Sequence, residues 1–186
     1  MGSEMCIRDS GDSPFAVAPP ACRLRAMSLS IRAATPADLP LIAALIRELA
    51  EYEHLLDEVR FDEAALGDHL FGERPMAEVV IGEVDGAEQG FALFFHNFST
   101  FEGKPGIYLE DLFVRPEVRG RGLGRALLTH LAGLAVRRGC ARFEWSVLDW
   151  NAPSIGFYRK LGARPMDDWT IMRLDGEALR ALAAQK

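Results

Sequence analysis

The stretch Arg119-Gly-Arg-Gly-Leu-Gly-Arg125 places three glycines at alternate positions, between an apolar strand pattern (residues 107–114) and an amphipathic helix pattern (residues 125–138). Glycines leave backbone N–H groups uncovered and allow backbone angles that other residues avoid. N–H groups at the start of a helix bind anions, because the positive end of the helix dipole lies behind them. We therefore expect a phosphate-bearing ligand at this loop.

Two familiar nucleotide-binding loops do not match this spacing. A P-loop requires Gly-Lys-Ser/Thr after four intervening residues, and that pattern does not occur. The dinucleotide fingerprint G-x-G-x-x-G fails because the third glycine, Gly124, comes one residue early. A glycine-rich turn that only caps the helix remains an alternative. The loop on its own thus indicates an anion without identifying it.

The elements that must position this loop alternate between strand and helix patterns. Thr35-Pro-Ala-Asp38 supplies an N-cap residue, an N1 proline and a first-turn acid, which together open a helix. Asp85-Gly86 between two apolar runs predicts a hairpin turn. The predicted strands are residues 29–33, 77–84, 90–98, 107–114, 142–148 and 170–174. The predicted helices are residues 35–49, 62–70, 125–138, 153–161 and 177–184.

This order of elements predicts the fold class. Early hairpin signals followed by a strand-loop-helix-strand unit favour a mixed α/β sheet with helices on its faces, rather than a purely parallel doubly wound sheet. A chain of 186 residues with 49% hydrophobic and 26% charged residues is long enough for one well-buried domain and short for two. We expect a single domain at residues 28–186.

Residues 1–27 show no hydrophobic period, and their acidic and basic residues balance. The piece Met5-Cys-Ile-Arg-Asp-Ser10 resembles the in-frame translation of a sequencing adaptor. A targeting peptide is the alternative, but there is no apolar core preceded by lysine or arginine. We expect a disordered or artefactual extension, with Met27 as the native start.

Composition narrows the class of partner. The net charge of −6 argues against a nucleic-acid binder, which needs a basic surface. No apolar run approaches the roughly 18 residues of a membrane span, so we expect no membrane partner. Cys6, Cys22 and Cys140 do not form a disulfide pattern, which favours a reducing, cytoplasmic location.

The glycine loop occurs together with other distinctive motifs. Tyr108-Leu-Glu-Asp-Leu-Phe-Val114 precedes it, and Asp149-Trp-Asn-Ala-Pro-Ser154 and Gly156-Phe-Tyr158 follow. This set resembles the acetyl-CoA core of the GNAT acyltransferases and is most similar to their spermidine/spermine (diamine) and thialysine N-acetyltransferase group. The resemblance extends to Glu48-Leu-Ala-Glu-Tyr-Glu53 and Phe71-Gly-Glu-Arg-Pro75, and so covers nearly all of the chain after Met27.

The resemblance implies acetyl-CoA as cosubstrate. It implies a mainly antiparallel sheet in which two adjacent parallel strands splay apart, so that the pantetheine arm lies in the gap and the glycine loop holds the pyrophosphate. Asn151 also suits a helix cap, and the two roles can coexist. The implied cofactor-binding residues are Leu112, Phe113, Val114, Arg119, Gly120, Arg121, Gly122, Leu123, Gly124, Arg125, Asn151, Ser154 and Tyr158.

The same resemblance implies two catalytic residues, Tyr158 as general acid and Glu110 as proton acceptor through water. A phenol with a pKa of about 10 stays protonated at neutral pH and can donate to a thiolate whose pKa is about 8.5. A primary amine with a pKa of about 10.4 is neutral in only about one molecule in 2,500 at pH 7, so it needs a proton acceptor. Because strand neighbours point to opposite faces, we expect Glu110 and not Asp111 in the cleft. The alternatives are a core aromatic at Tyr158 and a solvated strand acid at Glu110.

Acids and aromatic residues are expected to bind the cationic acceptor. By the resemblance, the candidates are Tyr52, Glu53, Glu110, Glu144, Trp145 and Asp168. The chain departs from the polyamine enzymes at residues 97–103, where their Asp-Pro-Trp is replaced and an acid is missing or displaced to Glu102. This departure weakens the case for spermidine and leaves thialysine, lysine-like amino acids or short diamines open.

Other chemistries have little support in the sequence. No metal site is expected, because His54, His69, His96 and His130 lack partners at a recognised spacing. Ser146 and Ser154 have no histidine at motif distance, which favours direct transfer without a covalent enzyme intermediate. The resemblance also implies a homodimer. A noncatalytic acyl-CoA-binding module is the alternative to an N-acetyltransferase.

Overall fold

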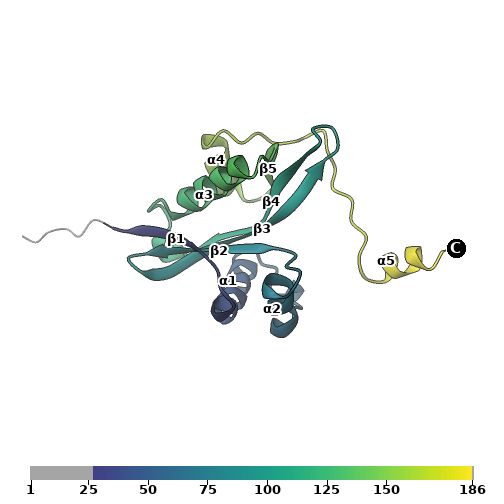
Figure 1. Cartoon of the computed structure of the whole chain (residues 1–186), viewed down its shortest axis with the longest axis horizontal. Helices are drawn as coiled ribbons and strands as arrows, with labels where there is room; N and C mark the ends of the chain where they lie inside the picture. Colours follow the sequence, from purple (N-terminus) through teal and green to yellow (C-terminus); the bar gives the residue numbers. More distant parts are fainter. Residues whose placement is uncertain (1–26, 186) are drawn as a thin grey trace, which may run out of the picture.

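The structure is a computed structural model that describes residues 27–185 (Figure 1). Its sheet has five strands in the order β1-β2-β3-β4-β5, and all neighbours are antiparallel except β4 and β5, which are parallel. The strands are β1 (Leu29–Ala33), β2 (Glu78–Val84), β3 (Ala87–Ser99), β4 (Lys104–Val114) and β5 (Arg142–Trp145). The α-helices are α1 (Leu39–Tyr52), α2 (Glu63–Phe71), α3 (Leu123–Arg137), α4 (Ala152–Lys160) and α5 (Gly176–Ala183). Short 3-10 turns are η1 (Pro36–Asp38), η2 (Leu56–Glu58) and η3 (Pro116–Val118).

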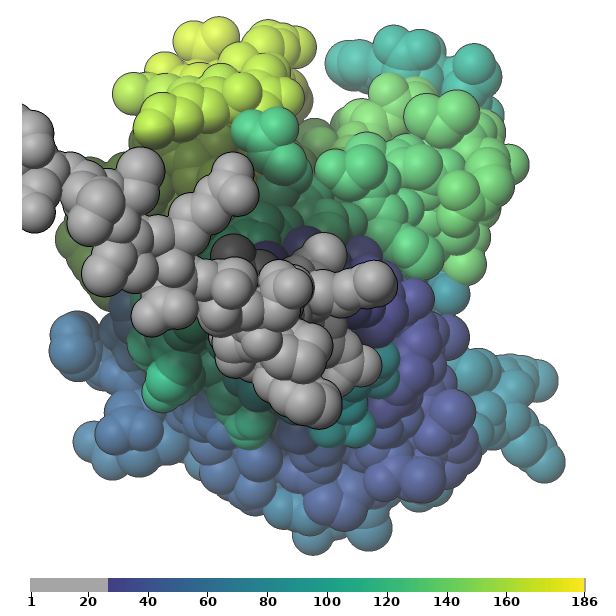
Figure 2. Space-filling view, turned by 90° about the vertical axis from the view of Figure 1, so that its left-hand side faces the viewer, coloured from purple at the N-terminus to yellow at the C-terminus, as the bar shows by residue number. Residues whose placement is uncertain are grey.

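The predicted mixed α/β fold is confirmed. Helices α3 and α4 cover one face of the sheet, and α1 and α2 cover the other (Figure 1). Figure 2 shows these layers from one end, with the purple and blue N-terminal residues below and the green and yellow-green residues above. Strand β2 supplies both layers, because Val79 and Ile81 pack towards α1 while Val80 and Val84 pack towards α3. Burial on both faces explains why Val79, Val80 and Ile81 are apolar in succession instead of alternating with polar residues.

Helix α3 follows the glycine loop and is fixed by its apolar stripe. Leu123, Leu127 and Leu131 recur at helical spacing and are fully or almost fully buried against the sheet. Burial of each leucine side chain stabilises the fold by about 1.5–3 kcal/mol. The start of α3, and with it the glycine loop, is therefore held firmly against β2 and β4.

Local signals placed most element boundaries within a few residues. The predicted hairpin between β2 and β3 is confirmed, and both turn residues have positive φ, 52° at Asp85 and 83° at Gly86. The strand predicted at residues 142–148 forms only in part. β5 ends at Trp145, and residues 146–148 leave the sheet. This early end of β5 opens the cleft described below.

The strand predicted at residues 170–174 is wrong. No strand forms there in the described structure, although the stretch holds β-branched and apolar residues, Thr170, Ile171 and Leu174, as strands often do. The segment runs along no sheet edge, and Ile171 is 73% exposed. Helix α5 follows it and lies apart from the sheet layers, with no buried residue (Figure 1). A strand needs a partner strand for its backbone hydrogen bonds, and in the described structure the segment pairs with none.

The expected N-terminal extension at residues 1–27 lies outside the described residues except for Met27. Of the helices that the structure describes, none has the length and apolar character that crossing a membrane would require.

Candidate functional site

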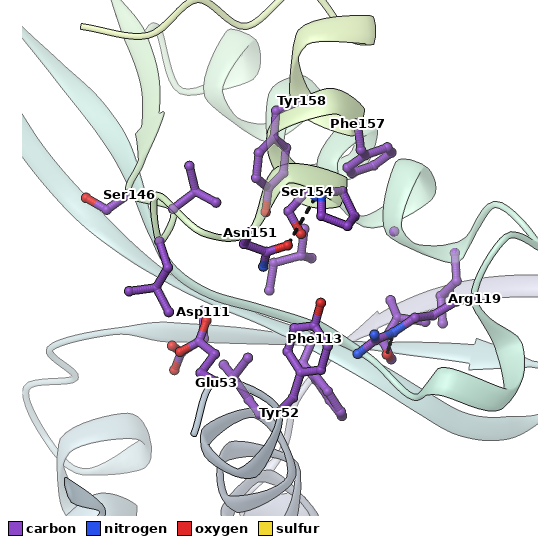
Figure 3. A pocket seen from close by; sticks show the side chains of 18 of the residues that line it. Tyr52, Glu53, Asp111, Phe113, Arg119, Ser146, Asn151, Ser154, Phe157 and Tyr158 are labelled. Atoms are coloured by element: carbon purple, nitrogen blue, oxygen red, sulfur yellow. Dashed lines mark hydrogen bonds between the residues drawn. The ribbon is translucent and has the colours of Figure 1, made fainter. Parts of the chain in front are cut away.

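A cleft of about 870 Å³ opens where the two parallel strands separate (Figure 3). Strands β4 and β5 pair only between Gly106–Leu109 and Arg142–Trp145. β4 then continues along β3 to Val114, whereas the chain after β5 turns away. One backbone edge of β4 beyond Leu109 is therefore left without a strand partner, and it forms one wall of the cleft.

A β-bulge in β4 brings two neighbouring acids to the same face. Phe94 of β3 pairs with Leu109 and Leu93 pairs with Asp111, so that Glu110 is an extra residue. Leu109 packs towards α3 before the bulge, and Phe113 packs towards α1 after it. The alternation has shifted by one residue, and both Glu110 and Asp111 line the cleft. The expectation that only one of them could enter it, which assumed a regular strand, is corrected here.

The glycine loop forms the far end of the cleft. Gly120 and Gly122 have positive φ, 75° and 95°, in the left-handed region that suits glycine. Gly122 is the N-cap of α3, and no side chain caps this end, so the first N–H groups of the helix are available to a ligand. The predicted anion-binding geometry is therefore present in the described structure.

Arg119 crosses the mouth of this loop. Its Nε donates a hydrogen bond of 2.8 Å to the carbonyl oxygen of Val114, and its guanidinium carbon lies 4.3 Å from the centre of the Tyr52 ring. The guanidinium also lies 5.6 Å from the centre of the Phe113 ring, so it is held at the cleft by one hydrogen bond and two cation–π contacts. Its remaining N–H groups can contact a phosphate.

Asn151 begins α4 on the opposite wall. Its Oδ1 accepts a hydrogen bond of 3.2 Å from the backbone N–H of Ser154, and the residue is only 5% exposed. It caps the helix as its sequence context predicted. The same residue lines the cleft. Capping and cleft lining therefore coexist in one side chain.

Tyr158 stands on α4 with its hydroxyl directed into the cleft (Figure 3). Its ring centre lies 5.1 Å from that of Trp145 and 5.4 Å from that of Phe157. Burial raises the pKa of the phenol to about 12, and the nearby Glu53 and Tyr52 add to the increase. The hydroxyl therefore keeps its proton at neutral pH and is available as a donor.

The end of α1 completes the cleft on the other side of the sheet. Arg115, next to the end of β4, donates hydrogen bonds of 2.8 and 2.7 Å to the two carboxylate oxygens of Glu48. This bidentate pair fixes α1 against β4 and so positions Tyr52 and Glu53, which line the cleft. Burial raises the pKa of the Glu53 carboxyl.

The structure brings most of the predicted residues together. The cleft is lined by Tyr52, Glu53, Glu110, Leu112, Phe113, Val114, Arg119, Gly120, Gly122, Leu123, Gly124, Arg125, Asn151, Ser154 and Tyr158. Arg121, Glu144, Trp145 and Asp168 do not line it in the described structure.

Each of three predicted acceptor residues that do not line the cleft has a structural explanation. The carboxylate of Glu144 accepts a hydrogen bond from Asn97, at 2.9 Å, and forms an ion pair with Arg142, at 2.8 Å. Trp145 packs into the apolar layer under α3 and against the Tyr158 ring. Asp168 lies exposed in the C-terminal segment, which comprises the described residues after α4 (161–185). Within one described chain, these three residues lie outside the lining of the cleft.

Sequence reasoning missed several cleft residues. Asp111 was set aside on the strand alternation that the bulge overturns. Ser146 and Val147 were assigned to a strand that ends before them. Arg173 comes from the C-terminal segment, for which the sequence carries no signal of cleft contact. A polar residue just after a short edge strand, such as Ser146, could have been singled out.

Two further expectations, that there is no metal site and that the location is cytoplasmic, stay predictions. Among residues 27–185, no three His, Cys, Asp or Glu side chains gather closely enough to hold a metal ion. Cys140 is a free thiol, which is compatible with a reducing compartment.

These features define a class of protein. An anion-binding glycine loop opens into the gap between splayed parallel strands, and acids and a protonated tyrosine stand at the other end. That arrangement suits transfer of a group from a phosphate-bearing donor to a cationic acceptor. The model of the acetyltransferase (GNAT) family matches residues 42–163, about two thirds of the chain. The chain belongs to this family and is an acetyltransferase.

Individual relatives match over most of their length. Thialysine N-epsilon-acetyltransferase of Sus scrofa is 40% identical over 169 residues, which cover 85% of this chain and 99% of the relative. L-ornithine N5-acetyltransferase of Arabidopsis thaliana is 32% identical, over 82% of this chain and 86% of the relative. Among solved structures, an integron cassette protein from the mobile metagenome of V. cholerae has a TM-score of 0.72 at 26% identity, over 85% of this chain and 99% of that one.

The geometry of the loop yields a first prediction. Alanine in the left-handed region costs roughly 1–2 kcal/mol, and 1.4 kcal/mol corresponds to a factor of about ten in affinity. We expect Gly122→Ala to weaken coenzyme A binding about tenfold, because the loop relaxes away from the geometry that exposes its N–H groups. The dissociation constant is measured by isothermal titration calorimetry.

Gly139→Ala is the matched control for this strain. Gly139 follows α3 at its other end, has a φ of 67°, and an added Cβ there would meet no atom within 4 Å. It does not line the cleft. The two variants should lose similar stability, but only Gly122→Ala should lose affinity. Equal affinity in both would show that the loop does not hold the cofactor.

Proposed function

We propose that the protein transfers an acetyl group from acetyl-CoA directly to a primary amine of a small cationic substrate, such as a diamine or a thialysine- or lysine-like amino acid. One observation carries the proposal. A single cleft joins the anion-binding loop at one end to Glu53, Glu110 and Asp111 at the other. An anionic donor and a cationic acceptor would thus meet between ends of opposite electrostatic preference.

The donor end suits coenzyme A. Gly120 and Gly122 present backbone N–H groups for the pyrophosphate, and Arg119 and Arg125 add positive charge. The unpaired edge of β4 at residues 112–114 offers main-chain groups to the pantetheine arm, as the missing strand would have done. Asn151 and Ser154 line the opposite wall.

Tyr158 and Glu110 supply the acid and base functions in this proposal. Tyr158 donates its proton to the departing thiolate, and its raised pKa keeps that proton in place until it is needed. Glu110 is exposed at the bulge and can accept a proton through water. The acceptor amine attacks the thioester carbonyl directly, so no acyl-enzyme forms.

The acceptor end favours a second positive charge. Thialysine and ornithine appear in the names of two of the relatives, and both are amino acids that carry an additional amino group. Glu53 and Asp111 can hold one cationic group while another reacts. The acid that polyamine enzymes place near the end of the second hairpin strand is not matched here, which favours short acceptors over spermidine.

An acceptor panel tests the reaction. Thiol release from acetyl-CoA is followed with thialysine, lysine, ornithine, short diamines, spermidine and a simple alkyl monoamine. We expect kcat/KM for acceptors with a second cationic group to exceed that for the monoamine by about tenfold or more, the equivalent of one modest ion pair. Coenzyme A binding without turnover of any amine would instead indicate a noncatalytic acyl-CoA-binding module.

Tyr158→Phe tests the general acid. We expect kcat to fall by about 10²–10⁴, the usual contribution of general acid catalysis, with coenzyme A affinity within about twofold of the wild type. Tyr108→Phe is the control, since its hydroxyl hydrogen-bonds to Ser146 at 2.8 Å and Tyr108 does not line the cleft. Full turnover by Tyr158→Phe would remove this residue from the mechanism.

We also propose that the protein forms a homodimer through its C-terminal segment. Trp169, Ile171 and Met172 are exposed apolar residues on a segment with a strand pattern but no strand partner. β5 is an edge strand, and its outer edge is open in the described chain. A second copy of the chain would cover both features. The segment of one copy lacks a strand partner, and the open edge of β5 in the other copy could pair with it.

Light scattering after size-exclusion chromatography tests the dimer. The wild type should have twice the mass of one chain, and Ile171→Asp should be monomeric because a charge would be buried in the contact. Val136→Asp is the control, since Val136 is 79% exposed on α3 and belongs neither to the segment nor to β5. A monomeric wild type, or an equal effect of both substitutions, contradicts the proposal.

A further inference from the structure

Asp111 occupies a different position from its neighbour Glu110. The bulge turns Asp111 towards α1, on the face of Phe113 and Leu93, where its side chain is largely buried. Glu110 lies at the same point of β4 but is exposed. Both line the cleft, so Asp111 is the inner of two adjacent carboxyl groups and Glu110 is the outer one.

The charged groups that act on the Asp111 carboxyl are two acids, Glu110 and Glu53. Figure 3 draws its carboxyl beside that of Glu53 from α1, with the Tyr158 hydroxyl directed into the cleft from α4. Burial, then the charges of Glu110 and Glu53, raise the pKa of Asp111 to about 7. The other titratable or charged residues lining the same cleft are Tyr52 of α1, Arg119 of the glycine loop, Arg125 of α3 and Arg173 of the C-terminal segment. In the described part of the chain, none of these three arginines forms an ion pair with Asp111.

Such a carboxylate is suited to the step that the acceptor amine requires. An ammonium ion must lose a proton before nitrogen can attack, and an ordinary aspartate is a weak acceptor for it. A pKa near 7 instead of the usual value makes the carboxylate a stronger base by about a thousandfold. The carboxylate form still predominates above neutral pH. Asp111 therefore both lines the cleft and carries a carboxylate that is basic enough to accept the proton.

Resting on the proposed function, we propose that Asp111 is a further catalytic residue, the group that takes the proton directly from the acceptor ammonium. The N–H bond breaks and the Asp111 carboxylate becomes a carboxylic acid, leaving a neutral amine with a free electron pair. That pair attacks the thioester carbonyl. Asp111 then passes its proton to solvent by way of the exposed Glu110, so one proton is released for each acetyl group transferred.

The later protons also balance. After attack, the nitrogen carries one proton too many and the sulfur is about to leave as thiolate. Tyr158 gives its proton to the sulfur as the C–S bond breaks, and it regains one from the nitrogen. The net products are the acetylated amine, the free thiol and one proton. Glu53 stays beside Asp111, where its charge keeps the neighbouring carboxyl basic.

The pH dependence of Asp111→Asn tests this role. We expect kcat/KM for a good acceptor from the panel to fall about 100-fold at pH 7, within the usual range for a lost general base. The loss should shrink as pH rises, because the neutral fraction of the amine grows about tenfold per pH unit below its pKa of about 10.4. In the wild type, kcat/KM should fall below about pH 7, where Asp111 binds a proton and stops accepting one.

Two further variants separate this role from a structural one. Glu110→Gln should lower kcat/KM less than Asp111→Asn, since water can replace the outer carboxylate. Asp68→Asn removes an exposed carboxylate on α2 outside the cleft and should leave the profile unchanged. Circular dichroism and coenzyme A affinity check that Asp111→Asn still folds and binds the donor.

The outcomes are distinct for the two proposals. A wild type that turns over no amine fails the proposed function itself. A wild type that turns over amines while Asp111→Asn is equally fast, or is slowed by the same factor at every pH, leaves the proposed function intact and overturns the role of Asp111. Recovery of Asp111→Asn between about pH 7 and 9 supports that role, because the amine is still mainly protonated there and a lost ammonium-binding contact would cost the same factor throughout.

Discussion

The site depends on one constraint on backbone pairing: β4 continues along β3 to Val114 after its other neighbour, β5, has stopped at Trp145. A strand held on one side only exposes the N–H and C=O groups of the other side, and these groups require new partners. The cleft, its main-chain wall and the position of the glycine loop all follow from this separation. The extra residue in β4 falls at the same point and turns two acids towards the opening.

The two ends of the cleft suit ligand groups of opposite charge. The donor is polyanionic, and at its end the chain offers N–H groups, the start of a helix and two arginines. The acceptor is cationic, and at its end three acids gather from α1 and β4. Tyr158 lies between them, packed on Trp145, where its proton is retained because ionisation in that surrounding is costly.

The sequence predicted the parts of the site that rest on local rules. Glycines that require positive φ, a capping Asn151 and the hairpin at Asp85 each have a short-range physical cause, and the structure confirms them. Asp111 could not be predicted, because a bulge has no clear sequence pattern and shifts every later side chain by one place. The segment at residues 170–174 could not be predicted either, since a strand depends on a partner that the sequence does not identify.

The two ends of the cleft differ in what builds them. Backbone groups and glycines make up much of the donor end, and few substitutions can alter them without disturbing the sheet. The acceptor end consists of side chains at the end of α1, at the bulge and in the segments beyond β5 and α4. Such side chains can be exchanged with little effect on folding. Evolution can therefore change which amine is used while the donor stays the same, and a laboratory search for new acceptors would begin with these positions.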